Sequence, residues 1–193
     1  TVLDGVRPFV GEHTCVMSVM AGVTIEMLSR DLNAKRVIRC MPNTPARIGK
    51  GITAYVASQA CTPEDRQLIE QLLAPLGAVE PIAAERLMDV VTAVSGSGPA
   101  YVFLLAEVLA AAAEQEGLDR ETAMRLASAT VAGAGALMLE TGETPGALRK
   151  QVTSPGGTTE AALDILGAGD GLGPLLRRAV SAAAQRSRDL GKR

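Results

Sequence analysis

The sequence is poor in aromatic residues and in histidine. Only 2% of its 193 residues are aromatic and none is tryptophan, so Ala, Leu and Val must fill the interior, which favours closely packed helices. The only histidine, His13, has no acidic or cysteine neighbour at ligand spacing. We therefore expect no metal site, and neither a zinc centre nor a histidine-based catalytic triad.

A strong net charge and a Cys-x-x-Cys pair are also missing. The net charge is −2 and the isoelectric point about 5.5, so we expect no basic surface that would attract nucleic acid or an anionic membrane. No apolar run reaches about 18 residues without a charge or a glycine, so no membrane-spanning helix is expected, and no signal peptide is visible. The odd number of cysteines predicts reduced thiols and a cytoplasmic location: Cys15, Cys40 and Cys61.

An initiating methionine and a dinucleotide-binding glycine fingerprint are absent as well. The chain opens with Thr1, so we expect a further N-terminal portion outside this sequence. The run from Gly96 to Tyr101 (Gly-Ser-Gly-Pro-Ala-Tyr) resembles such a fingerprint, but Tyr101 replaces its last glycine and no strand precedes it. We interpret this run as the start of a helix, with Ser97 as its N-cap.

The first 84 residues contain short apolar runs that alternate with helical patterns. This alternation predicts a parallel α/β sheet. The loops at Ala21-Gly22 and at Met41–Pro45 follow strands, and ligands bind at such strand ends in open α/β sheets. The charges of Lys35, Arg36 and Arg39 are expected to be solvated. The strands are expected at residues 14–20, 36–40, 51–57 and 78–82, and the helices at 23–32 and from Thr62 towards Gly77.

After Ala84 only helical patterns remain. The helix that Asp119 caps carries Gly133 and Gly135 in its interior, where each glycine costs about 1 kcal/mol relative to alanine. Close approach of a neighbouring helix would compensate, so this segment is expected to form a core shared by two chains; burial within one chain is the alternative. The helices are expected at 85–94, from Ser97 to Gly117, from Asp119 to Gly142, from Thr144 to 152, at 160–166 and at 174–190.

The run Val152-Thr153-Ser154-Pro155-Gly156-Gly157-Thr158-Thr159 leads into one of these helices. A helix N-terminus carries unpaired N–H groups and the positive end of the macrodipole, and glycines let a ligand approach them closely. Such a site suits a carboxylate or a phosphate. The alternative is a capped turn, with Thr158 or Thr159 as the N-cap.

Three motifs in this order resemble the pyrroline-5-carboxylate reductase family: Arg39–Pro45 (Arg-Cys-Met-Pro-Asn-Thr-Pro), Thr92–Tyr101 (Thr-Ala-Val-Ser-Gly-Ser-Gly-Pro-Ala-Tyr) and the run Val152–Thr159. The resemblance implies a Rossmann domain for NADH or NADPH and a helical domain that forms homodimers. Residues 1–84 would be the second half of the Rossmann domain, without its first strands, and residues 85–193 the helical domain. This favours the anion site over the capped turn.

The resemblance also implies roles for particular residues. The reaction would be hydride transfer from NAD(P)H to 1-pyrroline-5-carboxylate, which gives L-proline. Backbone N–H groups of Gly156, Gly157 and Thr158, helped by Ser154, would hold the substrate carboxylate. The Thr159 hydroxyl would hydrogen-bond the ring nitrogen and orient the substrate or relay a proton. The cofactor would be lined by Ala21, Met41, Pro42 and Asn43, with Gln151 and Val152 at its nicotinamide end.

Two other functions stay open. The chain could be a non-catalytic dimerisation module without a working cofactor site. It could also be another dehydrogenase with a Rossmann and a helical domain, such as a β-hydroxyacid type. That class needs a lysine in its catalytic helix, and neither Lys50 nor Lys150 stands in a matching context. Whether dimers assemble further, and which of NADH and NADPH is preferred, is left open.

Overall fold

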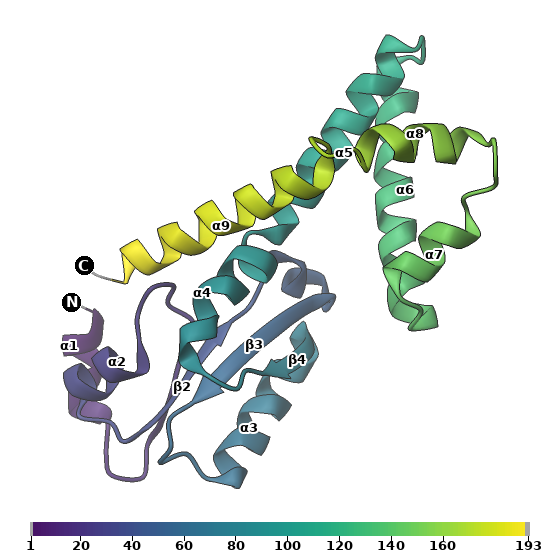
Figure 1. Ribbon diagram of the computed structural model, residues 1–193. Helices are drawn as coiled ribbons and strands as arrows, with labels where there is room; N and C mark the ends of the chain where they lie inside the picture. The colour runs from purple at the N-terminus through teal and green to yellow at the C-terminus, as the bar shows by residue number, and fades with distance from the viewer. Residues whose placement is uncertain (1, 192–193) are drawn as a thin grey trace. The chain divides into compact units, whose positions relative to one another are not determined.

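The computed structural model describes residues 2–191 and contains one small sheet and a series of helices (Figure 1). Contacts divide the chain into two compact units. The sheet unit comprises the residues up to Pro99 together with those from Ala179 on, and the helical unit comprises Ala100–Arg178. The predicted boundary at residue 84 stays a prediction. The strands are β1 (Cys15–Ser18), β2 (Arg36–Met41), β3 (Gly51–Ala57) and β4 (Gly77–Pro81).

Helices of very different length follow and flank these strands. In the sheet unit they are α1 (Val2–Val6), α2 (Ile25–Leu32), α3 (Pro63–Leu73) and α4 (Met88–Val91). The remaining helices are α5 (Gly98–Gln115), α6 (Arg120–Thr141), α7 (Pro145–Gln151), α8 (Thr158–Leu166) and α9 (Leu172–Leu190).

The four-stranded sheet has the order β1-β2-β3-β4 and is mixed. Strands β1 and β2 are parallel, as are β3 and β4, whereas β2 and β3 are antiparallel. The α/β class is confirmed, but the prediction of an all-parallel sheet is wrong at this pair. The reason is the connection between them, which holds only the 3-10 turn Thr44–Ile48, while a parallel pair needs a crossover of a dozen or more residues.

Successive residues of β2 point to opposite faces of the sheet and serve two cores. Val37 packs with Leu28 and Leu32 of α2, whereas Ile38 and Cys40 pack in a cluster with residues of α3. The start of α3 agrees with its sequence signature. Thr62 is the N-cap, as predicted, and the structure adds a capping box in which Asp65 is the second partner.

The predicted break at Ser95–Pro99 does not separate two helices, because helical backbone continues from Glu85 to Gln115. The segment Thr92–Gly96 is a π-helix, and Ser97 has helical dihedral angles instead of the extended ones of an N-cap. Pro99 has no N–H to donate to the preceding turn, and a π-turn is one of the ways in which a helix absorbs such a defect. The glycines and the proline therefore distort the helix without ending it.

The helical unit begins with the pair α5 and α6, whose contact is made of small side chains. Ala110 of α5 packs with Ala123 and Ala127 of α6. Asp119 accepts a hydrogen bond from the N–H of Thr122 and caps α6, as predicted. A Cβ added at Gly133 or Gly135 would meet nothing within 4 Å. Within the helical unit no neighbour approaches these glycines, so this unit does not bury the helix on its own.

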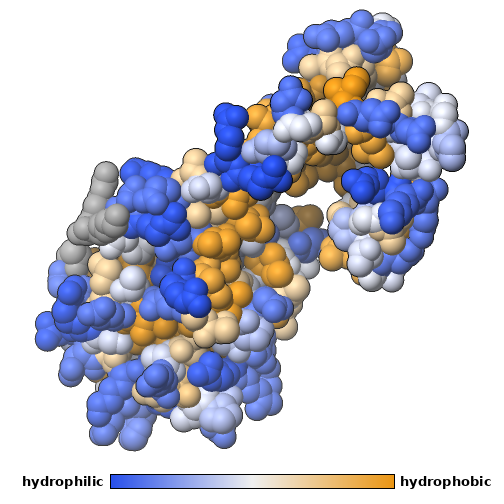
Figure 2. Space-filling model, in the orientation of Figure 1, coloured by the Kyte–Doolittle hydropathy of each residue, from blue (hydrophilic) through white to orange (hydrophobic). Residues whose placement is uncertain are grey.

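Apolar residues lie at the surface of the helical unit (Figure 2). Two helical stretches, Glu85–Gln115 and Arg120–Thr141, are long and apolar enough to cross a membrane by length and composition, and only 6% and 11% of their most apolar windows are buried. Both stretches contain charged residues and glycines, so the expectation that no helix spans a membrane stays a prediction. An apolar surface of this size requires a cover, which a lipid bilayer or another protein chain could supply.

Candidate active site

The loop between α7 and α8 brings the predicted substrate residues together in one turn. Gly157 is the N-cap of α8 with extended backbone, and no side chain caps the helix. Thr158 and Thr159 are its first two residues, so the alternative that either threonine is the N-cap is wrong. The loop is open in the single chain: Ser154 and Gly156 are exposed, and Thr159 is partly buried.

Two backbone N–H groups of this turn already have acceptors. The N–H of Gly156 donates to Oε2 of Glu160 at 2.7 Å, and the N–H of Gly157 donates to the carbonyl of Ser154 at 3.0 Å. Gly156 has a φ of +71°, a left-handed conformation that favours glycine. A carboxylate of the chain itself therefore occupies one of the amides that we predict to bind the substrate carboxylate.

The second glycine of the loop is required by close packing. A Cβ added at Gly157 would lie 2.5 Å from Oγ of Ser154 and 3.0 Å from its carbonyl oxygen. Ser154 is therefore held directly against the first amides of α8. Any side chain at position 157 would displace it, so the sequence Ser-Pro-Gly-Gly sets the distance between the serine hydroxyl and the helix end.

The two predicted nicotinamide contacts lie at the end of α7. The side-chain amide of Gln151 donates to Oε2 of Glu143 at 2.5 Å, which fixes its direction. Val152 is 66% exposed, so its apolar side chain is free to contact a planar ring. Thr153 ends the helix by donating its hydroxyl to the carbonyl of Arg149.

The other predicted cofactor residues belong to the sheet unit. Because β1 and β2 are parallel neighbours, the loops that follow them leave the same edge of the sheet, as predicted. Ala21 is exposed, and Pro42 and Asn43 are partly buried. Met41 differs, because its side chain is buried with Val56 and Met88. The predicted contact of the Met41 side chain with a cofactor therefore has little exposed surface in the single chain.

The two strand-end loops are fixed by contacts that the sequence did not predict. Asn43 accepts a hydrogen bond from the N–H of Ile52 at 3.0 Å through its side-chain oxygen. Gly22 has a φ of +77°, and a Cβ there would lie 3.1 Å from the backbone nitrogen of Gly191. The end of α9 thus packs backbone against backbone on the first loop. A cavity of about 260 Å³ lies beside it, lined by Gly22, Thr24, Arg39, Asp89, Ser187, Arg188 and Gly191.

A serine of the π-helix was not among the predicted site residues. Among the described residues, Ser95 has the only buried side-chain oxygen or nitrogen without a hydrogen-bond partner. Its neighbour Gly96 lies against Met41, whose sulfur would be 3.6 Å from an added Cβ. π-turns are frequent at functional sites, but the sequence signal here, Ser-Gly-Ser-Gly-Pro, indicated only a helix start.

These features fit one face of a nicotinamide cofactor. The loop after β1 presents two exposed apolar residues, Val19 (53% exposed) and Met20 (37% exposed). The buried hydroxyl of Ser95, close to the second loop, has no hydrogen-bond partner. An apolar wall with a few polar groups is the usual lining of a cofactor site. The described residues offer no glycine-rich turn at a strand end that could bind the cofactor's pyrophosphate. The loops described above therefore fit only the part of the cofactor outside the pyrophosphate.

The comparisons with known proteins decide the family. Residues 85–190 match the profile described as pyrroline-5-carboxylate reductase dimerisation. The chain belongs to the pyrroline-5-carboxylate reductase family. It is 41% identical to pyrroline-5-carboxylate reductase from Glycine max over 98% of its own length and 68% of that protein. It thus spans about two thirds of this relative.

Solved structures of pyrroline-5-carboxylate reductases have the same fold. The enzyme from Coxiella burnetii is 38% identical with a TM-score of 0.93, and the match covers 100% of this chain and 72% of that one. The enzyme from Plasmodium falciparum, solved with NADP bound, is 29% identical with a TM-score of 0.85, and the match covers 98% of this chain and 72% of that one. Membership of this reductase family removes the β-hydroxyacid dehydrogenase alternative.

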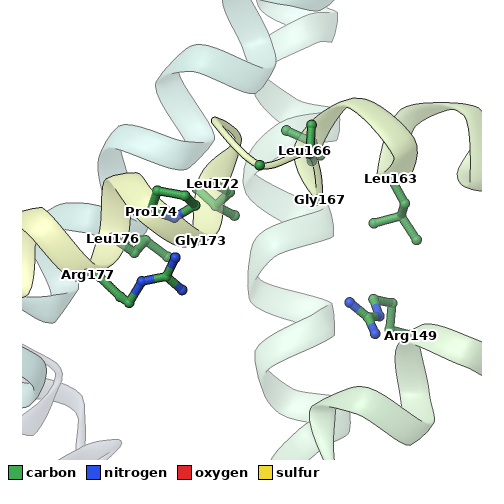
Figure 3. A pocket seen from close by; sticks show the side chains of 11 residues that line it. Arg149, Leu163, Leu166, Gly167, Leu172, Gly173, Pro174, Leu176 and Arg177 are labelled. Carbon is green, nitrogen blue, oxygen red and sulfur yellow. The ribbon is translucent and has the colours of Figure 1, made fainter.

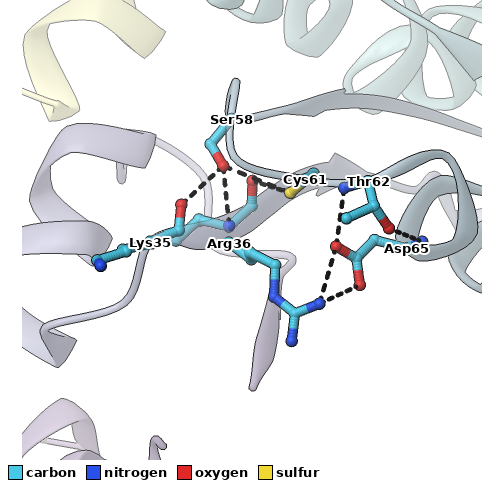
Figure 4. A network of polar contacts seen from close by, with 7 residues as sticks. Lys35, Arg36, Ser58, Cys61, Thr62 and Asp65 are labelled. Atoms are coloured by element: carbon cyan, nitrogen blue, oxygen red, sulfur yellow. Dashed lines mark hydrogen bonds and ion pairs between the residues drawn. The ribbon is translucent and has the colours of Figure 1, made fainter. Parts of the chain in front are cut away.

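One group of potential metal ligands exists among the described residues, and its surroundings oppose a cation. Cys15, Cys61 and Asp65 place their ligand atoms within 4.8 Å of one another. However, the Arg36 guanidinium donates to both oxygens of Asp65, at 3.1 and 3.3 Å (Figure 4). Burial, and next the neighbouring Cys61, raise the pKa of Cys15 to about 11, which keeps the thiol protonated at neutral pH.

Arg36 and Arg39 also correct the sequence expectation that both are solvated. Arg36 pairs with Asp65 at 3.1 Å, and Arg39 is 4% exposed and pairs with Glu85 at 3.2 Å. Lys35 is exposed as expected. The partners lie 29 and 46 residues away in the sequence, so no local pattern could reveal them.

The helical unit of this reductase-family chain contains a further cavity of about 530 Å³. Leucines line it, with Arg177 at one end and Arg149 at the other (Figure 3). None of the predicted substrate residues from Ser154 to Thr159 lines it. The predicted substrate loop is thus an exposed turn of the single chain and does not form the wall of this cavity.

Proposed function

We propose that this chain binds 1-pyrroline-5-carboxylate at the N-terminus of α8 and contributes to its NAD(P)H-dependent reduction to L-proline. The observation that carries the proposal is the loop Ser154–Thr159, where the N–H of Gly156 already donates to a carboxylate, that of Glu160. The loop therefore has the geometry for an acid group. A small imino acid supplies such a group at one end and a ring nitrogen at the other.

The substrate carboxylate would interact with the open N–H groups of the first turn of α8. The N–H groups of Thr158 and Thr159 belong to the first positions of the helix and have no intrahelical acceptor. The N–H of Gly156 becomes available when the exposed side chain of Glu160 swings away. Ser154, held against Gly157, adds a hydroxyl donor beside these amides. The positive end of the helix dipole favours the anion further.

The Thr159 hydroxyl would face the ring nitrogen of the substrate. Thr159 is the second residue of α8, so its side chain leaves the same first turn whose amides would bind the acid group. A threonine hydroxyl is a poor acid, so its main contribution is to orient the ring, while water or prior protonation of the imine supplies the proton.

The nicotinamide cofactor, NADP or NAD, would supply the hydride. Ala21, Pro42 and Asn43 would line it from the strand-end loops, and the buried Met41 would support the second loop from the end of β2. Gln151 and Val152 would contact its nicotinamide end. The bound NADP of the Plasmodium falciparum relative supports a cofactor of this class. The side-chain bond of Gln151 to Glu143 would keep the amide oriented during the reaction.

A second copy of the chain would cover the apolar helices α5 and α6. The match of residues 85–190 to a dimerisation profile supports this homodimer. Gly133 and Gly135 face open space in the single chain, and a partner helix could approach the backbone there closely. This arrangement would also account for the long apolar stretches without a membrane, in keeping with a cytoplasmic location.

The experiment is a titration of the chain with L-proline and with NADPH, followed by a steady-state assay with 1-pyrroline-5-carboxylate. Proline is expected to slow amide hydrogen exchange at residues 154–160, and NADPH fluorescence is expected to change on binding. Proline protection without NADPH binding would favour the non-catalytic dimerisation module. Absence of proline protection at this loop would overturn the substrate site.

A further inference from the structure

One carboxylate holds both strand-end loops of the sheet unit. Oε1 of Glu85 accepts a hydrogen bond from the N–H of Ile25 at 2.7 Å and another from Nη1 of Arg39 at 3.2 Å. Ile25 is the first residue of α2 and follows the loop that contains Ala21. Arg39 lies on β2, two residues before Met41. The Glu85 side chain therefore bridges segments 60 and 46 residues away in sequence.

The burial of Arg39 makes this bridge important. The Arg39 side chain is 5% exposed, whereas the Glu85 side chain is 30% exposed. When a buried guanidinium loses its carboxylate partner, its positive charge stays buried without a counter-charge, which strongly destabilises the folded conformation. Charge-assisted hydrogen bonds are also about twice as strong as neutral ones. Without Glu85, Arg39 would have to turn towards water, and β2 and its following loop would shift with it.

We propose that Glu85 is a positioning residue for the cofactor: it fixes the loops at Ala21 and at Met41–Asn43 relative to each other and touches no substrate itself. The inference rests on the proposed function of these two loops. It extends that function to a residue at the start of the helical stretch Glu85–Gln115, outside every predicted site motif. Through Glu85, the beginning of this stretch sets the shape of the cofactor wall.

The same strand carries a matched arrangement at its other end. Asp65 accepts from Nη1 of Arg36 at 3.1 Å and from the N–H of Thr62, the N-cap of α3, at 2.9 Å (Figure 4). Both carboxylates therefore join an arginine of β2 to a backbone N–H at a helix N-terminus. Arg36 begins β2 and lies at the edge opposite the loop after Met41. Asp65→Asn thus removes an equivalent bridge away from the proposed cofactor loops.

The test compares Glu85→Gln, Glu85→Ala and Asp65→Asn in the full chain by amide hydrogen exchange. Loss of the Glu85 bridge is expected to speed exchange of the Ile25 amide and of residues 20–25 and 41–45 by about tenfold, more in the alanine than in the glutamine variant. Asp65→Asn is expected to affect Thr62 and the start of α3 and to leave these loops unchanged. Equal protection of both loops in wild type and Glu85→Ala would overturn the proposal.

Steady-state kinetics with NADPH supply the second readout. Glu85→Gln is expected to raise KM for NADPH about tenfold with a smaller change in kcat, because the loops bind the cofactor and do not perform the chemistry. Asp65→Asn is expected to leave KM for NADPH unchanged. An equal rise of KM for NADPH in both variants would show that Glu85 only stabilises the fold and does not position the cofactor loops. A wild-type chain that binds no NADPH would overturn the proposed function, and hydrogen exchange would still decide whether Glu85 holds the loops.

Discussion

The sheet unit and the helical unit differ in what they bury. Large side chains such as Leu28, Leu32 and Ile38 are 2% exposed or less in the sheet unit. In the described part of the helical unit only Ala110, Ala123 and Ala127 are buried, while Phe103 is 60% exposed. The sheet unit therefore has a core of its own. The helical unit has long helices, but the large apolar side chains that would form a core are exposed.

The long-range ion pairs of the sheet unit are less exposed than its local pair Arg30–Asp31, whose side chains are 69% and 35% exposed. The pairs of Arg36 and Arg39 in the sheet unit have side chains between 5% and 30% exposed. In the helical unit, Arg125 and Glu121 form a pair whose side chains are 61% and 85% exposed. Exposed pairs contribute little to stability, so charge does not replace the missing core. The exposed apolar side chains of the helical unit support the proposal that a second copy of the chain covers it.

Removing a core side chain should separate the two units most clearly. Ile38→Ala is expected to lower the free energy of unfolding by about 2–5 kcal/mol, because the side chain is fully buried and a cavity remains. The same deletion in the helical unit, Ile165→Ala, begins from a side chain that is 75% exposed and should cost less than about 1 kcal/mol. Urea denaturation followed by circular dichroism measures both. Similar losses at the two positions would contradict the contrast.

A charged residue on α5 tests whether the exposed apolar surface of the helical unit is a dimer interface. Phe103→Asp is expected to raise the dimer dissociation constant about a hundredfold or more, because burial of a phenylalanine contributes about 1.5–3 kcal/mol and a homodimer buries two. Leu72→Asp on α3, where the leucine is 57% exposed, serves as the control and should leave the dimer intact. Sedimentation velocity measures both. A monomeric wild-type chain, or a Phe103→Asp variant that dimerises as tightly as wild type, would contradict this interface.

The sequence predicted most elements because local chemistry decides them. Thr62-Pro63, Asp119 and Thr144-Pro145 begin their helices as expected, since a cap and a proline act within one turn. The antiparallel pairing of β2 and β3 was missed because strand periodicity is the same in both orientations. The π-turn at Thr92–Gly96 was missed because glycine and proline can distort a helix as well as end it.

For the candidate site, the sequence located the loops but not what holds them. The glycines of the α8 loop and the two strand-end loops were visible as local patterns. The bridge from Glu85 to Ile25 and Arg39 depends on residues far apart in the sequence, and no spacing reveals such a contact. The bond from Gly156 to Glu160 was also missed, although the two residues are only four apart, because the helical pattern marks Glu160 only as a polar position.

Thr159→Ala tests whether the helical unit carries the chemistry. The substitution is expected to lower kcat/KM for 1-pyrroline-5-carboxylate at least about tenfold, equivalent to about 1.4 kcal/mol, because the ring nitrogen loses its hydroxyl partner. Stability should hardly change, because Thr159 is only partly buried. Thr158→Ala keeps the backbone amides and removes the adjacent hydroxyl, so it is the matched control. An unchanged kcat/KM for Thr159→Ala would remove this residue from the mechanism.

Alkaline pH should weaken the sheet unit first, because all three cysteines lie there. Burial raises the pKa of Cys40 from 9.0 to about 12. Well below pH 9 the thiol is protonated in both states and stability is flat; above pH 9 the unfolded chain releases the proton that the folded chain keeps, so stability falls as pH rises. The loss attributable to Cys40 between pH 9 and pH 10 is about 1 kcal/mol. Urea denaturation at pH 8, 9 and 10 should show a shallower decline for Cys40→Ala, whereas equal slopes would show that the Cys40 thiol is not shielded in the folded chain.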